Sequence, residues 1–130
     1  MQKQLADFNL DDFVVAASIE FDEIKTNWKL LMENFIEPYH VQFVHKTTTS
    51  QPLADHYVVE DDHCLGSAVD LTSDQQNKGK EGTLSVSSRY LTLFPNFVLG
   101  VYYPDQLGVH LNQPISAGTT HQRRVIYQLK

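Results

Sequence analysis

The spacing of hydrophobic residues changes once along the chain and separates a helical region from a sheet. Near residue 30, apolar side chains recur at i, i+3, i+4 and i+7, which places them in one stripe on a helix. They are Trp28, Leu31, Met32 and Phe35. Thr26 or Asn27 is suited to cap the helix start, and Pro38 predicts that the helix ends or kinks near Glu37. Residues 39–45 are expected to add another helical turn or two.

The rest of the pattern is typical of strands. Residues 13–21 are rich in strand formers and predict a first strand, and beyond residue 57 the hydrophobic period becomes two. The further predicted strands are 57–59, 65–71, 84–93, 97–103, 107–112 and 121–129. An acidic turn is expected at residues 60–62, and the polar segment 72–82 is predicted to be a flexible hairpin loop. The fold class is therefore α+β, with a twisted antiparallel sheet of five or more strands packed against the helix at 27–37.

Length and charge narrow the possible functions. We expect residues 1–130 to form a single domain that begins with a polar surface segment at residues 1–12. The formal net charge of −6 argues against a nucleic-acid partner, because binding to phosphates needs clustered lysine and arginine. No apolar run approaches the ~20 residues of a membrane helix, and the amino terminus lacks the apolar core of a signal peptide. A cytoplasmic location is expected by default.

The candidate chemistry lies at the end of the predicted helix. Glu37, His40 and His45 present one carboxylate and two imidazoles. Two neutral imidazoles and a carboxylate form the facial triad of non-haem Fe(II) oxygenases, which leaves positions open for oxygen and substrate. On a straight helix, however, His45 lies about 140° round the axis from His40, so Pro38 or a local bulge would have to redirect the rings. Spacing alone also allows two structural histidines.

A family resemblance adds to this interpretation. It rests mainly on residues 27–45, extends to Leu93-Phe94-Pro95-Asn96, and covers nearly the whole chain. The matching elements are Asn27-Trp28-Lys29, Glu33-Asn34, Glu37-Pro38-Tyr39-His40 and His45. The run resembles the signature of ring-hydroxylating and related Rieske oxygenase catalytic domains, whose fold resembles a helix-grip, lipid-transfer-like fold.

The resemblance assigns roles to four residues. It implies that His40 and His45 are the ligands of a mononuclear Fe(II), and that Asn34 is an asparagine near the iron. Glu37 matches a carboxylate that bridges subunits in the family, linking the iron site to a histidine of the neighbouring chain's Rieske cluster and helping electron transfer. Asn27 and its two successors match a structural entry to the helix, without a chemical role.

Two features depart from the family pattern. A Rieske [2Fe–2S] centre needs two cysteines and two histidines, whereas this sequence has only Cys64, so we expect residues 1–130 to contain no Rieske domain and not to bind that cluster. Cys64 is expected to be a buried small apolar residue.

The family's third iron ligand is an Asp on a long helix after the sheet, and no carboxylate occupies the matching position. Asp70 and Asp105 are conceivable substitutes, although each is typical of a turn or edge residue. Metal occupancy is accordingly expected to be weak.

Other chemistry-bearing residues are assigned structural roles. The four remaining histidines are interpreted as unliganded surface residues, and His110, lying between two apolar neighbours, is predicted to face solvent. They are His56, His63, His110 and His121. The strand aromatics are expected to belong to the core rather than to a ligand pocket. They are Tyr90, Phe94, Phe97, Tyr102 and Tyr103.

Three functions remain open. The chain could be a partial oxygenase catalytic domain that acts, as a monooxygenase or dioxygenase, on small organic substrates with a Rieske or reductase electron donor, and that is inactive alone. It could be a non-catalytic module that binds a small apolar ligand. It could also be a structural remnant.

In each case the last predicted strand indicates self-association, because it presents an apolar sheet face. That face bears Val125, Tyr127 and Leu129, or Ile126 in the opposite register, and predicts a homo-oligomer, with a dimer favoured. The alternative is that residues 1–12 fold over that face.

Overall fold

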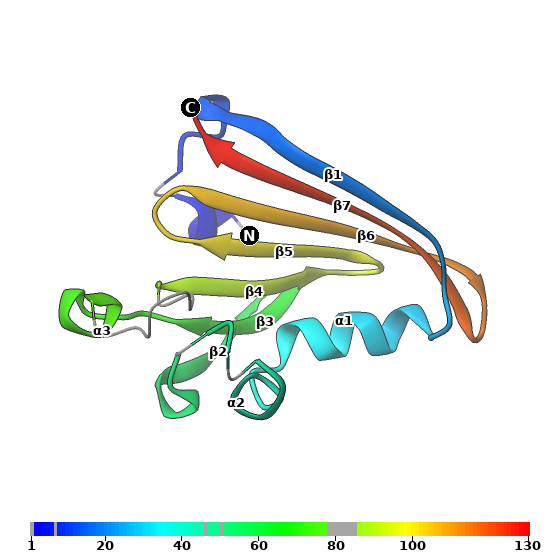
Figure 1. Ribbon diagram of the computed structural model, residues 1–130, viewed down its shortest axis with the longest axis horizontal. Coiled ribbons are helices and arrows are strands. Elements are labelled where there is room, and N and C mark those ends of the chain that lie inside the picture. Colours follow the sequence, from blue (N-terminus) through cyan, green and yellow to red (C-terminus); the bar gives the residue numbers. More distant parts are fainter. Residues whose placement is uncertain (1, 7, 46, 50, 78–85) are drawn as a thin grey trace.

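The described part of the chain forms a seven-stranded antiparallel sheet with short helices (Figure 1). The computed structural model describes residues 2–6, 8–45, 47–49, 51–77 and 86–130. The strands are β1 (Phe13–Ile24), β2 (His56–Asp61), β3 (Cys64–Val69), β4 (Ser88–Leu93), β5 (Phe97–Tyr102), β6 (Gln106–Ser116) and β7 (Thr119–Leu129). The helices are α1 (Trp28–Ile36), α2 (Val41–Val44) and α3 (Ser73–Asn77), with 3₁₀ turns η1 (Gln2–Leu5), η2 (Leu10–Asp12) and η3 (Leu53–Asp55). The predicted α+β, helix-grip-like class is confirmed.

The strand order places one long connection across the sheet. The order is β1-β7-β6-β5-β4-β3-β2, so β2 to β7 form a meander of neighbouring hairpins, and β1 pairs with β7. The two edges, β1 and β2, are joined by the segment that carries α1 and α2 (Figure 1). This segment lays α1 against one face, where it contacts β3, β4 and β6. The face that α1 covers is the one that can enclose a site.

Hydrogen bonds hold both ends of α1. At its start, the Asn27 side chain accepts from the backbone N–H of Lys29 at 2.9 Å and donates to the Ala117 carbonyl, in the β6–β7 turn, at 2.7 Å. Asn27, rather than Thr26, is therefore the cap. At the other end, Ser67 of β3 donates to the Ile36 carbonyl at 2.7 Å. The helix is thus fixed at one end to the β6–β7 turn and at the other to β3.

The hydrophobic core occupies the other face of the sheet. Its buried members are Val59, Cys64, Ala68, Leu91, Leu99, Val101 and Leu107. Burial of Cys64 confirms its predicted role. Leu5 and Phe8 pack against this cluster, and the Phe8 ring lies 4.8 Å from that of Tyr103. The expectation of a purely surface segment before residue 13 is therefore wrong, since its apolar side chains cover part of the core face.

Several boundaries differ from those predicted. Within the proposed loop at 72–82, residues Ser73–Asn77 form the short helix α3, while 78–82 lie outside the described residues. β4 begins at Ser88, and the first two positions of its predicted range, 84 and 85, also lie outside them. Strand β2 continues through the acidic residues to Asp61, so the turn begins at Asp62, which has a φ of 51°. Aspartate tolerates this left-handed conformation better than most residues.

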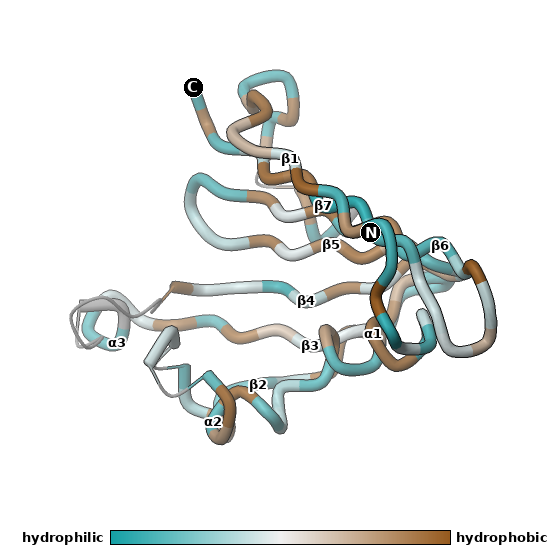
Figure 2. The backbone as a smooth tube through the Cα atoms, turned by 45° about the vertical axis from the view of Figure 1, so that its right-hand side comes forward, coloured by the Kyte–Doolittle hydropathy of each residue, from teal (hydrophilic) through white to brown (hydrophobic). Residues whose placement is uncertain are grey.

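Hydropathy follows the architecture. Hydrophobic positions concentrate in the strands and α1, whereas the turn between β5 and β6 is hydrophilic (Figure 2). Among the residues described, none of the helices combines the length and the apolar character that a membrane crossing requires.

Candidate active site between helix and sheet

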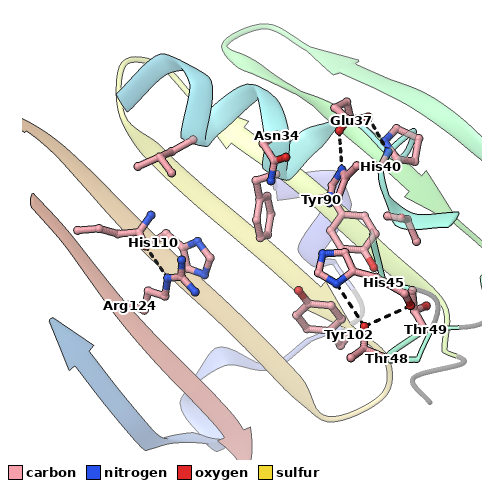
Figure 3. A pocket seen from close by; sticks show the side chains of 15 residues that line it. Asn34, Glu37, His40, His45, Thr48, Thr49, Tyr90, Tyr102, His110 and Arg124 are labelled. Carbon is pink, nitrogen blue, oxygen red and sulfur yellow. Dashed lines mark hydrogen bonds and ion pairs between the residues drawn. The ribbon is translucent and has the colours of Figure 1, made fainter. Parts of the chain in front are cut away.

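A pocket of about 440 Å³ lies between the helical connection and the sheet (Figure 3). Its helical side is formed by α1, the turn that follows it, α2, and the first residues after α2. These residues are Leu31, Asn34, Phe35, Glu37, Pro38, His40, Val41, His45, Thr48 and Thr49. Its sheet side is formed by Tyr90, Tyr102, His110, Gln122 and Arg124. All four residues assigned to the site from sequence, Asn34, Glu37, His40 and His45, therefore line one pocket.

Glu37 organises the turn between the two helices. One carboxylate oxygen accepts from the backbone N–H groups of Tyr39 and His40, at 2.6 and 3.2 Å. The other lies 2.5 Å from Nδ1 of the His40 ring. A carboxylate only accepts, so Nδ1 carries the proton and the lone pair of the neutral ring is at Nε2. Carboxylates that orient metal-binding histidines commonly make this contact.

His45 is held in a similar way. It ends α2, and its Nδ1 lies 3.2 Å from the hydroxyl oxygen of Thr48. The same hydroxyl donates to the carbonyl of His45 at 3.3 Å, so its oxygen is available to accept from Nδ1. With that tautomer, His45 also presents a lone pair at Nε2.

The two rings lie close together because His40 and His45 flank the short helix α2, at its N-cap and C-cap. α1 stops at Ile36, and Glu37 has an extended backbone with φ −89° and ψ 130°, so the expected irregularity near Pro38 lies before both histidines. His45 leaves the helical conformation at the end of α2, with φ −98° and ψ 29°. The centroids of the His40 and His45 rings are 5.1 Å apart. Two imidazoles bound through Nε2 at about 2.1 Å to one ion, at right-angled to tetrahedral angles, would place their centroids about 4.5–5.2 Å apart. The separation fits a shared ion.

A third ligand is missing from the described part of the chain. Among those residues, no three His, Cys, Asp or Glu side chains are grouped to hold a metal ion. Asp70 instead accepts from the Tyr57 hydroxyl at 2.6 Å and pairs with Arg89 at 2.7 Å. Asp105 lies in the turn between β5 and β6, and neither aspartate lines the pocket. The donors present therefore match two of the three positions of a facial triad.

The prediction that His110 faces solvent is wrong. It lines the pocket, and its ring lies 5.0 Å from the ring of Phe35 on α1. Burial lowers the pKa of His110 to about 4, with a smaller contribution from the nearby Arg124 guanidinium, so the ring is neutral near pH 7. The alternation with Val109 was interpreted correctly, but the polar face of β6 is the one that α1 covers.

His56 also departs from the expected surface position. Both of its ring nitrogens are buried and have no hydrogen-bond partner within the described residues, and the ring stacks at 6.1 Å on Tyr90. Burial lowers its pKa. His63 is exposed, as expected, and His121 lies 3.1 Å from the Gln113 side-chain oxygen, away from the pocket.

The strand aromatics divide between the two faces. Phe97 and Tyr103 pack against the core cluster, as expected. The expectation of core positions is wrong for the other three, because Tyr90 and Tyr102 line the pocket and Phe94 is exposed. The Tyr90 hydroxyl donates to Gln51 at 2.9 Å. Burial raises the pKa of the Tyr102 hydroxyl.

A polar row continues along the last two strands. Arg124 donates through Nε to the Gln122 side-chain oxygen at 2.5 Å, and its guanidinium lies 4.9 Å from the ring centre of Phe21. Gln122 in turn donates to Asn112 at 2.5 Å. In the sheet register, Arg124 is paired with His110 and Gln122 with Asn112.

Comparison with known proteins identifies the family. The family described as ring hydroxylating alpha subunit (catalytic domain) matches residues 10–129. The chain belongs to this family. The comparison with curated protein sequences gives no match.

Solved structures of Rieske oxygenases share the fold. The quaternary ammonium Rieske monooxygenase CntA in complex with an inhibitor aligns over 98% of this chain with a TM-score of 0.75 and 17% identity. Pseudomonas putida CBB5 NdmA with caffeine aligns over 89% with a TM-score of 0.62 and 13% identity. The terminal oxygenase of carbazole 1,9a-dioxygenase from Nocardioides aromaticivorans IC177 aligns over 92%, at 0.56 and 14%. These matches cover 33%, 35% and 40% of those chains, so this chain spans about a third of their length.

Sequence reasoning missed the sheet side of this pocket. The missed residues are Tyr90, Tyr102, His110, Gln122 and Arg124. A signal was present in β6, where His110 and Asn112 alternate with the apolar Val109 and Leu111. That signal identifies a polar face, but whether such a face meets water or a helix depends on where the β1–β2 connection crosses the sheet.

Proposed function

We propose that this chain is part of the catalytic domain of a Rieske non-haem iron oxygenase, and that His40 and His45 hold a mononuclear Fe(II). The observation that carries the proposal is that the two imidazole rings line one pocket with their centroids 5.1 Å apart. Glu37 contacts Nδ1 of the His40 ring and leaves Nε2 available to a metal. The proposed reaction is hydroxylation of a small organic substrate, by monooxygenation or dioxygenation.

The residues present have distinct tasks in this proposal. Iron supplied with electrons would provide the activation of dioxygen. Glu37 keeps the proton on Nδ1 of His40 and thereby directs Nε2 at the metal position. Phe35, Val41 and Tyr90 line the pocket with apolar and aromatic surface that excludes water from the site. Asn34 lines the same pocket and offers an amide near the metal.

Two components must come from outside the described residues. One is the third metal ligand, a carboxylate. Two histidines alone leave most of the coordination sphere to water, so we expect weak metal occupancy. The electrons are the other, and we propose a Rieske cluster of a neighbouring subunit or a reductase as their source. The Glu37 side chain is 39% exposed, so a neighbouring chain could reach it. This supports a role in linking the site to such a cluster.

A second candidate function is metal-free ligand binding, because the described residues supply only two metal ligands. A non-catalytic module would use the same pocket to bind a small ligand without a metal. The two functions differ in their need for His40 and His45, because a metal-free binding module has no requirement for converging Nε2 lone pairs.

Metal titration separates these functions. The chain is titrated anaerobically with Fe(II), and with Co(II), whose absorption reports nitrogen ligands, using wild type and the variants His40→Ala and His45→Ala. His121→Ala serves as the matched control, because this histidine lies away from the pocket. We expect weak binding that is lost in both site variants and kept in the control. Equal binding by all four proteins would rule out this metal site, and tightly bound stoichiometric iron would contradict the expected weak occupancy.

The proposal includes a homodimer formed through the face opposite α1, in a single-domain cytoplasmic protein. That face carries Tyr127 and an apolar depression of about 310 Å³. Leu5 and Phe8 cover part of the face, which is the alternative to self-association considered from the sequence. Sedimentation at micromolar concentration distinguishes the two: a dimer supports the proposal, whereas a 14.9 kDa monomer means that the internal cover is sufficient.

A further inference from the structure

Arg124 differs from the other two arginines of the chain. Arg89 pairs with Asp70 at 2.7 Å, and Arg123 lies 3.5 Å from a carboxylate oxygen of Glu20. Within the described residues, the contacts of Arg124 are instead with the neutral Gln122 side chain and the Phe21 ring. Arg124 nevertheless lines the pocket and is partly buried there. A partly desolvated cation without an anion is unfavourable, so its presence calls for a partner.

The geometry of the guanidinium leaves donors for such a partner. Its bond to Gln122 uses Nε, whereas the two Nη groups, which carry four of the five N–H donors, have no acceptor among the described residues. This planar fork suits a carboxylate, which can accept two parallel hydrogen bonds from it.

Two neighbours add further donors. His110 is the cross-strand partner of Arg124 and is neutral, since burial lowers its pKa to about 4. The Tyr102 hydroxyl lines the same pocket and has no hydrogen-bond partner in the described part of the chain. A Cβ placed on Gly100 would come within 2.8 Å of that hydroxyl, so the absence of a side chain at Gly100 leaves room for the Tyr102 ring.

No acidic side chain neutralises this end of the pocket. Glu37 is the one carboxylate among its described lining residues, and it already accepts from the His40 ring and two backbone N–H groups. The positive end is therefore a local feature of a chain whose formal net charge is −6. Figure 3 shows Arg124 and His110 together on the strands, while His40 and His45 project from the helical side.

We infer that Arg124, assisted by Tyr102 and His110, binds the carboxylate of the substrate. The inference rests on the proposed function, because it assigns His40 and His45 to the reacting end of the same pocket. A small aromatic or aliphatic carboxylate would lie with its anionic group on the strands β6 and β7 and its apolar part along Phe35 and the two tyrosines. A substrate with only a cationic amine would meet Arg124 unfavourably.

Binding of small probes to the metal-free chain tests this inference. Isothermal titration compares benzoate with benzamide, which has a similar shape but no charge, and with sulfate as an inorganic anion. The variants are Arg124→Gln, Arg124→Lys and Tyr102→Phe. Arg123→Gln is the matched control, because it removes the same charge from the neighbouring residue, which does not line the pocket. Circular dichroism establishes that each variant is folded.

The expected pattern is specific. Benzoate binds wild type and benzamide binds at least tenfold more weakly. Arg124→Gln lowers benzoate affinity about ten- to a hundredfold, as expected for charge-assisted hydrogen bonds, and Arg124→Lys lowers it less. Tyr102→Phe lowers it about two- to tenfold. Arg123→Gln stays within twofold of wild type. If Arg124→Gln does not fold, the benzamide comparison and Tyr102→Phe still decide.

Several results would overturn the inference. They are an absence of benzoate binding, equal binding of benzamide and benzoate, an unchanged affinity in Arg124→Gln, and equal losses in the two arginine-to-glutamine variants. Sulfate that competes as strongly as benzoate would show a general anion site and reject the substrate class. The proposed metal site is judged separately, since His40→Ala is expected to lose Co(II) and keep benzoate.

Discussion

The two faces of the sheet are built from alternate residues of the same strands, yet they bury different chemistry. On one face, Leu91 and Leu99 are cross-strand partners in an apolar core that the amino-terminal segment partly covers. On the other, Tyr90, His110 and Arg124 line the pocket between the sheet and the helical connection. The hydrophobic effect accounts for the residues of the first face, because burial of apolar side chains favours folding.

The second face has no such explanation. Its groups include a neutral histidine, a tyrosine hydroxyl without a partner in the described residues and a guanidinium without a carboxylate. Covering polar groups without pairing them costs stability, so a fold keeps such a face where a ligand completes the pairing. The contrast supports the proposal that the core face stabilises the fold and that the α1 face binds a ligand. The predictions below test that division.

The largest expected effect is on the core face. Leu91 has an exposed fraction of 0%, so Leu91→Ala removes buried surface and leaves a cavity. We expect the free energy of unfolding to fall by about 2–5 kcal/mol. Urea denaturation of the variant and wild type measures the change. A loss below about 1 kcal/mol would mean that this face is not the stabilising core.

The next effect is a pH dependence on the binding face. An unfolded histidine titrates near 6.5, whereas His110 titrates at about 4 in the folded chain. Between these values the unfolded state binds more protons, so stability falls as the pH is lowered from about 6.5 to about 4. The full shift corresponds to a loss of about 3 kcal/mol.

Denaturation at a series of pH values compares wild type with His110→Gln. This variant should lose less stability over that range, because the group that titrates has been removed. His56 shifts in the same direction and remains in both proteins, so it does not affect the difference. Identical pH profiles would show that His110 is not buried as described.

A smaller effect concerns the metal end. Glu37→Gln keeps an oxygen for the backbone N–H groups of Tyr39 and His40 but removes the charge beside the His40 ring. We expect Co(II) affinity to fall about 10- to 100-fold, while unfolding in the absence of metal changes little. Spectrophotometric titration gives the affinity. Undiminished affinity would mean that the carboxylate does not orient the ligand.

The smallest effect compares two tyrosines of the binding face. The Tyr90 hydroxyl donates to Gln51, so Tyr90→Phe leaves a buried acceptor unpaired and should lower stability by about 1–2 kcal/mol. Tyr102→Phe should lower it by less than about 0.5 kcal/mol, because its hydroxyl has no such partner in the described residues. Thermal unfolding of both variants provides the test, and the reverse order would contradict the assignment of Tyr102 to a ligand.

The helical part of the site was predictable from the sequence because its determinants are local. The apolar stripe of α1 and the cap at Asn27 define the helix, and Pro38 follows its end. Glu37, His40 and His45 lie within a few residues of one another, so a short interruption is enough to bring them together. The strands were predictable for a similar reason, because a strand is recognised from polar and apolar residues that alternate over neighbouring positions.

The sheet side of the site was not predictable, because it depends on distant parts of the chain. His110 and Arg124 become neighbours only through the pairing of β6 with β7, and both are partly buried where they line the pocket below the helical connection. The same alternation is compatible with a solvent-facing surface. A row of polar residues therefore indicates a face, and the path of the β1–β2 connection decides what that face does.

The central claim is that one pocket has a metal-binding end and an anion-binding end, and paramagnetic NMR tests it most directly. Proton shifts and line widths of benzoate are recorded with the wild-type chain and Co(II), and then with Arg124→Gln and His40→Ala. The account predicts strong paramagnetic effects on bound benzoate in wild type. They should fall in Arg124→Gln, which loses benzoate, and in His40→Ala, which loses the metal. Benzoate and Co(II) that both bind wild type without any paramagnetic effect would contradict a shared site.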